Sequence, residues 1–277
     1  MTRAALLQLT SSDDPAENLP RVVSEVRAAA AEGAGFVLTP EVTNCVSASR
    51  TRQREVLRVE NEDRTLAGLR DEAARAGIWL LIGSLAVKSD PPEERFANRS
   101  FLIAPDGAIT ARYDKMHMFD VQVSEAETYR ESAGYAPGQR AVIAETPFGT
   151  LGLTVCYDLR FPYLYRALAQ SGAEILTVPS AFSPATGPLH WEPLLRARAI
   201  ETGSYVLAPA QTGDHAASRG RARSTWGHSL AVSPWGEVLA DAGTAPGVTF
   251  VDIDRSAVAE ARARIPSLTH GRDFEGP

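Results

Sequence analysis

The residue in this sequence with the strongest capacity for chemistry is Cys156, one of two cysteines. It follows a run of small and β-branched residues that predicts a strand, and Pro162 predicts the first turn of a helix shortly afterwards. A thiol at such a junction can face the positive end of the helix dipole, which favours the nucleophilic thiolate. The alternative is a small buried core residue, the role that we assign to Cys45 because it lacks a comparable setting.

Charged residues elsewhere in the chain are suited to assist a thiol. Glu41 follows a strand predicted over Phe36–Leu38, and α/β sheets build their sites at the carboxyl ends of strands. Lys115 is one of two lysines beside 26 arginines, so it can mark a position that requires a compact ammonium. A loop glutamate and an exposed lysine are the alternatives from the residues alone. Glu131, in a stretch rich in Gly and Tyr, carries a weaker signal.

Other candidate groups carry less information. None of the five histidines has a local signature of a partner for the thiol, and His190 is interpreted as a capping or packing residue. The segment 219–223 is basic and contains glycine. It can attract an anionic substrate, although a solvated, mobile loop is the simpler interpretation. The two cysteines lack metal-ligand spacing, so we expect no metal site.

The composition argues against several other classes of protein. A chain of 277 residues that is 44% hydrophobic can bury a sizeable core. Its net charge of -6 argues against a nucleic-acid partner, which requires a concentrated basic face. The sequence has neither a signal-peptide pattern nor an apolar run near the ~20 residues of a membrane span. We therefore expect a cytoplasmic protein with no membrane partner.

The predicted elements occur twice in the same order, beginning at the strands predicted over 4–9 and 151–155. Each half continues with a helix, a short strand, a helix closed by glycine, another strand and a Pro-x-Gly hairpin. Each sheet then has one apolar face without helices, which is most simply buried against the other sheet. This predicts an α/β fold, a four-layer α-β-β-α sandwich with an internal pseudo-twofold repeat, as a single domain over residues 1–277. Helices are predicted over 16–32, 62–76, 162–171, 189–201 and 255–264, and loops over 90–95 and 212–224.

Three segments, Pro-Glu41, Tyr-Asp-Lys115 and Cys156-Tyr-Asp-Leu-Arg-Phe-Pro, together resemble the nitrilase (carbon–nitrogen hydrolase) superfamily. They fall in the family's order, and the resemblance extends over nearly the whole chain. It implies that Glu41 is the general base and acid, Lys115 the oxyanion-stabilising lysine and Cys156 the nucleophile. It also implies that Glu131 is the second active-site glutamate, and that no cofactor takes part.

Within this superfamily the chain is most similar to the branch that contains deaminated glutathione amidase and omega-amidase, on segments that include Trp226-Gly-His-Ser. The resemblance implies release of ammonia from a small carboxylate-bearing amide through a thioester, with deaminated glutathione as the first candidate. The alternatives are 2-oxoglutaramate and an N-carbamoyl amino acid. Two features depart from the family: Tyr163 stands where relatives usually have Glu, and the loop 214–223 is basic and longer than in some relatives.

The resemblance also bears on the groups that surround the reacting amide. We expect the backbone N–H of Tyr157 to share the oxyanion with the lysine. Arg160, Phe182 and Thr186 are the candidates for substrate binding. Members of the family commonly pair through their outer helices, so we expect a homodimer or a larger homo-oligomer.

Overall fold

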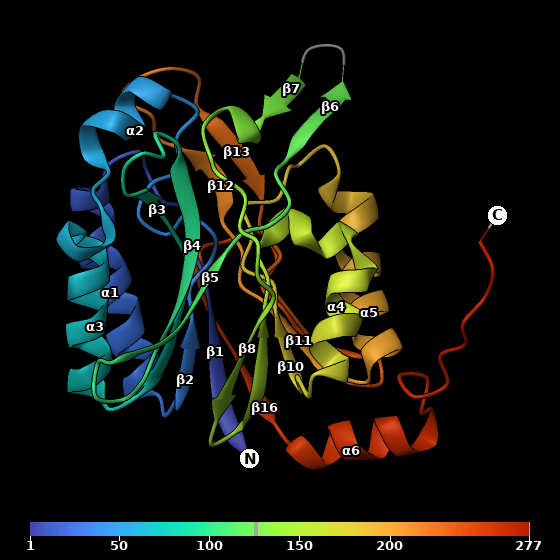
Figure 1. Ribbon diagram of the computed structural model, residues 1–277. Coiled ribbons are helices and arrows are strands. Elements are labelled where there is room, and N and C mark those ends of the chain that lie inside the picture. Colours follow the sequence, from blue (N-terminus) through green and yellow to red (C-terminus); the bar gives the residue numbers. More distant parts are fainter. Residues whose placement is uncertain (125–126, 277) are drawn as a thin grey trace.

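Two six-stranded sheets form the centre of the molecule, and helices cover their outer faces (Figure 1). The computed structural model describes residues 1–124 and 127–276. The first sheet has the order β16 (Gly247–Ile253), β1 (Thr2–Gln8), β2 (Phe36–Leu38), β3 (Trp79–Lys88), β4 (Phe96–Ile103) and β5 (Ile109–Asp114). The second has the order β15 (Val238–Asp241), β14 (Leu230–Val232), β11 (Tyr205–Ala208), β10 (Ile175–Thr177), β9 (Gly149–Leu153) and β8 (Val142–Thr146).

Helices α1 (Pro15–Ala31) and α3 (Arg64–Ala76) cover the first sheet, and α4 (Pro162–Gln170) and α5 (Gly187–Thr202) cover the second (Figure 1). The strand β1 shows why both faces of a sheet are apolar, because successive side chains point to opposite faces. Ala4 and Leu6 belong to the core cluster between the sheets, whereas Ala5 and Leu7 belong to the cluster beneath α1 and α3. The predicted four-layer sandwich is confirmed.

The internal repeat is also confirmed, with one exchange between the halves. Strands β1, β2 and β3 run parallel, as do β9, β10 and β11. Each parallel set is extended by an antiparallel hairpin, β4–β5 in one sheet and β14–β15 in the other. At the opposite edge, β8 pairs with β9, its neighbour in sequence, but β1 pairs with β16 from the far end of the chain. The last strand of the second half therefore completes the first sheet.

The five predicted helices are present, the last being α6 (Arg255–Arg264), and Gly77 and Gly203 end α3 and α5 in the left-handed conformation. The prediction of a loop over 212–224 holds only for residues 216–222, because β12 (Thr212–His215) and β13 (Arg223–Trp226) form a hairpin around them. Its buried positions are polar, so hydropathy gives no strand signal. The sequence interpretation also missed α2 (Arg50–Val56), β8, and the hairpin of β6 (Asp120–Ser124) and β7 (Glu127–Arg130). In the described ranges, no helix is both long and apolar enough to cross a membrane.

One glycine allows the two halves to meet at the strand ends. A Cβ atom on Gly83 of β3 would lie 2.0 Å from the carbonyl oxygen of Thr39 and 2.4 Å from Cβ of Pro179. Thr39 follows β2 and Pro179 follows β10, the equivalent strands of the two halves. Any side chain at position 83 would therefore push apart the two segments that lead into the site described below.

We expect Gly83→Ala to lower the free energy of unfolding by about 1–3 kcal/mol, because backbone and proline atoms must move to accept the methyl group. Urea titration followed by circular dichroism measures this change. Gly35→Ala is the matched control, since its Cβ would meet only Thr2 Cγ2 at an ordinary 3.6 Å. Equal stability of the two variants would show that the contact at Gly83 is unimportant.

Candidate active site

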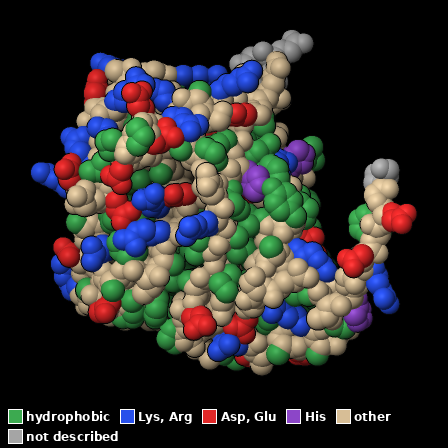
Figure 2. Space-filling view, viewed as in Figure 1, with side chains coloured by type: hydrophobic (Ala, Val, Ile, Leu, Met, Phe, Trp, Pro, Cys, Tyr) green, Lys and Arg blue, Asp and Glu red, His purple; other side chains and the backbone are tan. Residues whose placement is uncertain are grey.

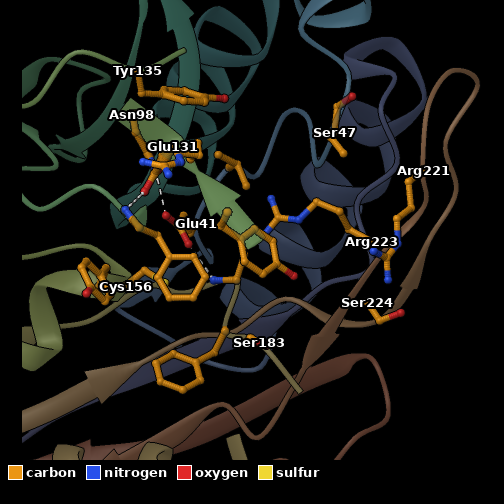
Figure 3. A pocket seen from close by; sticks show the side chains of 18 of the residues that line it. Glu41, Ser47, Asn98, Glu131, Tyr135, Cys156, Ser183, Arg221, Arg223 and Ser224 are labelled. Carbon is orange, nitrogen blue, oxygen red and sulfur yellow. Dashed lines mark hydrogen bonds between the residues drawn. The ribbon is translucent and has the colours of Figure 1, made fainter. Parts of the chain in front are cut away.

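The charged residues and the cysteine singled out in the sequence meet in one cavity of about 530 Å3 (Figure 3). Glu41 follows β2, Lys115 directly follows β5, and Cys156 follows β9, so each side chain leaves the carboxyl end of a strand. Glu131 opens the short turn that follows β7. Among the described residues, no group of three or more His, Cys, Asp or Glu side chains is placed to hold a metal ion.

The ammonium of Lys115 lies between two carboxylates. Its Nζ donates hydrogen bonds to Oε1 of Glu41 at 2.9 Å and to Oε1 and Oε2 of Glu131 at 3.0 and 2.9 Å. The lysine is 2% exposed, and burial alone would lower its pKa. The charges of Glu131 and Glu41 outweigh burial and hold the pKa of Lys115 well above its usual value. The side chain is therefore a fixed positive charge inside the cavity.

The carboxylate of Glu41 is held from three sides. Besides Lys115, Nδ2 of Asn98 donates to Oε1 at 2.9 Å, and the backbone N–H of Ala181 donates to Oε2 at 2.8 Å. Burial favours the neutral acid, but the charge of Lys115 and these hydrogen bonds keep the pKa of Glu41 below its ordinary value. Glu41 is therefore ionised at neutral pH and can accept a proton.

The carboxylate of Glu131 is positioned by the same network. Its Oε2 accepts the backbone N–H of Phe119 at 2.7 Å, and its Oε1 lies 3.5 Å from Nδ2 of Asn98. The amide of Asn98 thus reaches both glutamates, and this residue was missed in the sequence. The signal that was available is a single buried amide inside the apolar strand β4.

The sulfur of Cys156 points into the cavity as a thiol. The residue has a left-handed φ of 51° and begins the short turn η3 (Cys156–Arg160). Its thiol donates a hydrogen bond to Glu41, and burial together with the charge of Glu41 raises the pKa of Cys156 above its usual value. The setting at the strand-to-helix junction therefore does not by itself favour the thiolate, and a base is needed to take the proton. Helix α4 starts only at Pro162, after η3, and its dipole does not overcome burial.

The turn η3 is fastened by the buried carboxylate of Asp158. Its Oδ2 accepts the backbone N–H of Val155 at 2.9 Å and the hydroxyl of Tyr113 at 2.6 Å. Its Oδ1 accepts the backbone N–H of His117 at 3.0 Å and contacts Nδ1 of the same residue at 2.6 Å. The other ring nitrogen of His117 contacts the hydroxyl of Tyr163, the residue that departs from the family pattern. His117 therefore supports the turn that carries the cysteine.

Of the residues expected to bind substrate, Phe182 and Thr186 line the cavity but Arg160 does not; Tyr157, whose backbone N–H is expected to share the oxyanion, also lines it. The guanidinium of Arg160 lies 5.5 Å from the ring centroid of Phe182 and 5.9 Å from that of Tyr157, and it contacts Nδ1 of His190 at 3.2 Å. Arg160 thus stacks against two residues of the wall. The buried hydroxyl of Thr186 has no hydrogen-bond partner in the described part of the chain.

Four other arginines line the cavity: Arg50, Arg130, Arg221 and Arg223. Figure 3 shows Arg221, Arg223 and Ser224 on the side of the cavity away from Glu41, Glu131 and Cys156. The basic segment 219–223 was the sequence signal for two of these arginines. The other two come from elements that the sequence interpretation did not predict, α2 and β7.

The loop between β12 and β13 is anchored to the first half of the molecule. Nδ1 of His215 contacts the carbonyl oxygen of Ser11 at 2.8 Å, and the backbone N–H of Ser218 donates to Oδ2 of Asp13 at 2.8 Å. Nη1 of Arg219 forms an ion pair with Glu55 at 2.8 Å. The segment 219–223 is therefore tethered at its start, and residues 219–222 are exposed to solvent, as the interpretation of a solvated loop expects.

Comparisons with known proteins agree with this geometry. The family model described as carbon–nitrogen hydrolase matches residues 3–263. A deaminated glutathione amidase of Yersinia enterocolitica is 40% identical over 269 residues, covering 97% of this chain and 92% of that protein. An omega-amidase of Homo sapiens is 37% identical over 273 residues, covering 98% of this chain and 95% of that protein.

The fold agrees as well. The crystal structure of the C. elegans NitFhit protein matches with a TM-score of 0.90 and 34% identity, covering 98% of this chain and 65% of that chain. The family model covers both halves of the repeat and every residue of the Glu41, Lys115 and Cys156 network. This chain belongs to the carbon–nitrogen hydrolase family, and it is a hydrolase that acts on carbon–nitrogen bonds other than peptide bonds.

Proposed function

We propose that this protein is a cysteine-dependent amidase that hydrolyses a small carboxylate-bearing amide through a thioester acyl-enzyme. The observation that carries the proposal is the continuous hydrogen-bonded set of Cys156, Glu41, Lys115 and Glu131 in a cavity large enough for a substrate. A nucleophile, an ionised base within hydrogen-bonding reach and a fixed cation are the parts that acyl transfer requires.

In the first step the sulfur of Cys156 attacks the amide carbon while Glu41 accepts the thiol proton. The new C–S bond forms as the carbonyl electron pair moves onto oxygen. The ammonium of Lys115 and the backbone N–H of Tyr157 stabilise this oxyanion. A thiol with a raised pKa is suited to this step, because its proton moves to Glu41 only as the attack proceeds.

In the second step the protonated Glu41 returns its proton to the amide nitrogen, the C–N bond breaks and the amine departs, leaving a thioester on Cys156. Glu41 then takes a proton from a water molecule, whose oxygen attacks the thioester carbon. The C–S bond breaks, the acid is released and the thiol is restored. Glu131 keeps Lys115 charged and correctly placed throughout.

Deaminated glutathione is the substrate that we propose first, on the name of the relative that is 40% identical. This compound has no primary amide, so its hydrolysis releases a peptide amine and not the ammonia that the resemblance implied. The human relative named omega-amidase supports 2-oxoglutaramate as a second substrate, from which ammonia would leave.

We further propose that residues 1–277 act as one carbon–nitrogen hydrolase domain in the cytoplasm and that the chain self-associates. Support for one domain is the core cluster that both halves share. Support for self-association is the exposure of large apolar side chains on the outer helices, with Leu189 of α5 77% exposed and Tyr163 of α4 63% exposed. Sedimentation equilibrium distinguishes a monomer from a dimer or larger assembly.

A panel of three amides tests the substrate. We expect kcat/KM to be highest for deaminated glutathione, lower for 2-oxoglutaramate and lowest for an N-carbamoyl amino acid, measured by mass spectrometry of the released acid. Mass spectrometry of intact protein quenched during turnover should show an acyl adduct that is absent from Cys156→Ala. Turnover of the panel by that variant would refute the nucleophile.

The pH dependence of alkylation tests the base. Because the pKa of Glu41 lies below its ordinary 4.5, we expect iodoacetamide to modify Cys156 at nearly the same rate between about pH 6 and about pH 8. The rate should fall only as pH drops through the pKa of Glu41. In Glu41→Gln the thiol must lose its proton to solvent before it reacts. The rate of Cys156 alkylation should therefore rise about tenfold for each pH unit over that range.

Peptide mapping shows which cysteine iodoacetamide has alkylated, and the variant Cys156→Ala reports any alkylation of Cys45. Cys45 is 1% exposed and burial raises its pKa to about 12, so this variant should remain unmodified. A rate that is independent of pH in both the wild type and Glu41→Gln would remove Glu41 from the proposed role.

Substitution of the buried lysine tests the oxyanion role. Lys115→Arg keeps the charge but must fit a planar guanidinium between two carboxylates where the ammonium is 2% exposed. We expect kcat to fall by at least about 10²–10³-fold, the cost of losing one oxyanion donor. Lys88→Arg, at the end of β3 and away from the cavity lining, should keep the wild-type kcat. Comparable activity of both variants would contradict the assignment.

A further inference from the structure

We propose that the side of the cavity formed by Arg221 and Arg223 is an anion-binding subsite. It would take a carboxylate on the amine side of the scissile amide and so determine which amides are good substrates. This inference rests on the proposed amidase function and adds the recognition of the departing group to it.

The charges of the cavity lining are unbalanced. Five cationic side chains line it, and its two carboxylates, Glu41 and Glu131, are both bonded to Lys115. The chain as a whole carries a net charge of -6, so a positive surface is not general to this protein. The excess positive charge lies on the arginines, and an anionic ligand is the group that would balance it.

The arginines of the wall are not committed to ion pairs. No carboxylate among the described side chains forms an ion pair with Arg221, Arg223 or Arg50, whereas Arg219 on the same loop pairs with Glu55. Arg50 donates to uncharged oxygens only, at 3.0 Å to Oε1 of Gln53 and at 3.4 Å to two backbone carbonyls.

One donor in this wall is buried and unused. Nε of Arg223 has no accessible surface and no hydrogen-bond partner in the described part of the chain. A buried guanidinium N–H without an acceptor is costly, because it has lost water and gained nothing in return. A carboxylate bound at this wall would satisfy it if the side chain turned toward the ligand, since guanidinium and carboxylate match in geometry.

The hairpin that carries the two arginines is anchored at its base before any ligand arrives. Gln211, directly before β12, donates from Nε2 to Oγ of Ser11 at 3.0 Å and to the backbone oxygen of Glu41 at 3.1 Å. His215 and Ser218 fix the loop that follows. The hairpin that carries Arg221 and Arg223 is therefore tied to the backbone of the catalytic glutamate, which lowers the entropy cost of binding.

The size of the cavity favours a subsite for the part of the substrate that leaves as the amine. Deaminated glutathione and 2-oxoglutaramate deliver the same acyl group, so they differ only in what leaves. A cavity of about 530 Å3 lies in the range that encloses a drug-sized ligand, and 2-oxoglutaramate is far smaller. The peptide amine of deaminated glutathione ends in a carboxylate, which can reach a wall away from Cys156 (Figure 3).

The comparison of these two substrates tests the subsite. In Arg221→Ala/Arg223→Ala we expect the ratio of kcat/KM for deaminated glutathione to that for 2-oxoglutaramate to fall about 10- to 100-fold, chiefly through KM of the longer substrate. Arg219→Ala, on the same loop but outside the cavity lining, should keep the wild-type ratio. With Arg221 retained, Arg223→Lys should keep more of the wild-type ratio than Arg223→Ala does.

A second measurement compares two substrates within each protein, so a difference in stability between the proteins cancels. Deaminated glutathione with its terminal carboxylate converted to an amide should lose about 10- to 100-fold in kcat/KM with the wild type and much less with the double variant. Equal losses in both proteins, or an unchanged ratio in the double variant, would overturn the subsite while the amidase activity stands. Absence of turnover of either natural substrate by the wild type would overturn the proposed substrate class and the subsite with it.

Discussion

A buried ammonium stays charged only if its surroundings replace the water that it has lost, and Lys115 meets this condition through two carboxylates. Each partner comes from a different part of the chain, Glu41 from the exit of β2 and Glu131 from the turn after β7. Loss of Lys115 would leave two carboxylates facing each other without a counter-charge. The ends of these elements are therefore constrained to one place, and the rest of the site is arranged around that constraint.

The same network sets the protonation states of Glu41 and Cys156, on which the proposed reaction depends. Positive charge at Lys115 keeps Glu41 ionised, and the negative charge of Glu41 keeps Cys156 protonated. The cavity thus holds a thiol beside an ionised carboxylate, and in the mechanism proposed above the thiolate forms only as the substrate is attacked. On the far side the excess charge is positive (Figure 3), so the two ends of a bound amide meet opposite environments. The outer face in Figure 2 shows instead a mixture of both signs.

Sequence alone was sufficient for the sandwich and its repeat, because each relies on apolar periodicity and on Pro and Gly at turns. It was also sufficient to predict that Glu41, Lys115 and Cys156 share one site, since each follows a strand within a known motif. It could not predict Asn98, whose role depends on which face of β4 it occupies, or the β12–β13 hairpin, whose buried residues are polar. Nor could it predict that burial would outweigh a helix dipole at the sulfur, or that Arg160 would stack outside the cavity.

The pairing of β1 with β16 has a consequence for how the chain is made. Strand β1 is synthesised long before β16, so its outer edge stays unpaired until the second half of the sequence has been made. Until then a nascent chain exposes an unpaired, apolar edge, the kind that invites mispairing and recruits chaperones. Native order in the first sheet thus depends on the second half of the chain, and truncation just before residue 247 should leave the outer edge of β1 unpaired.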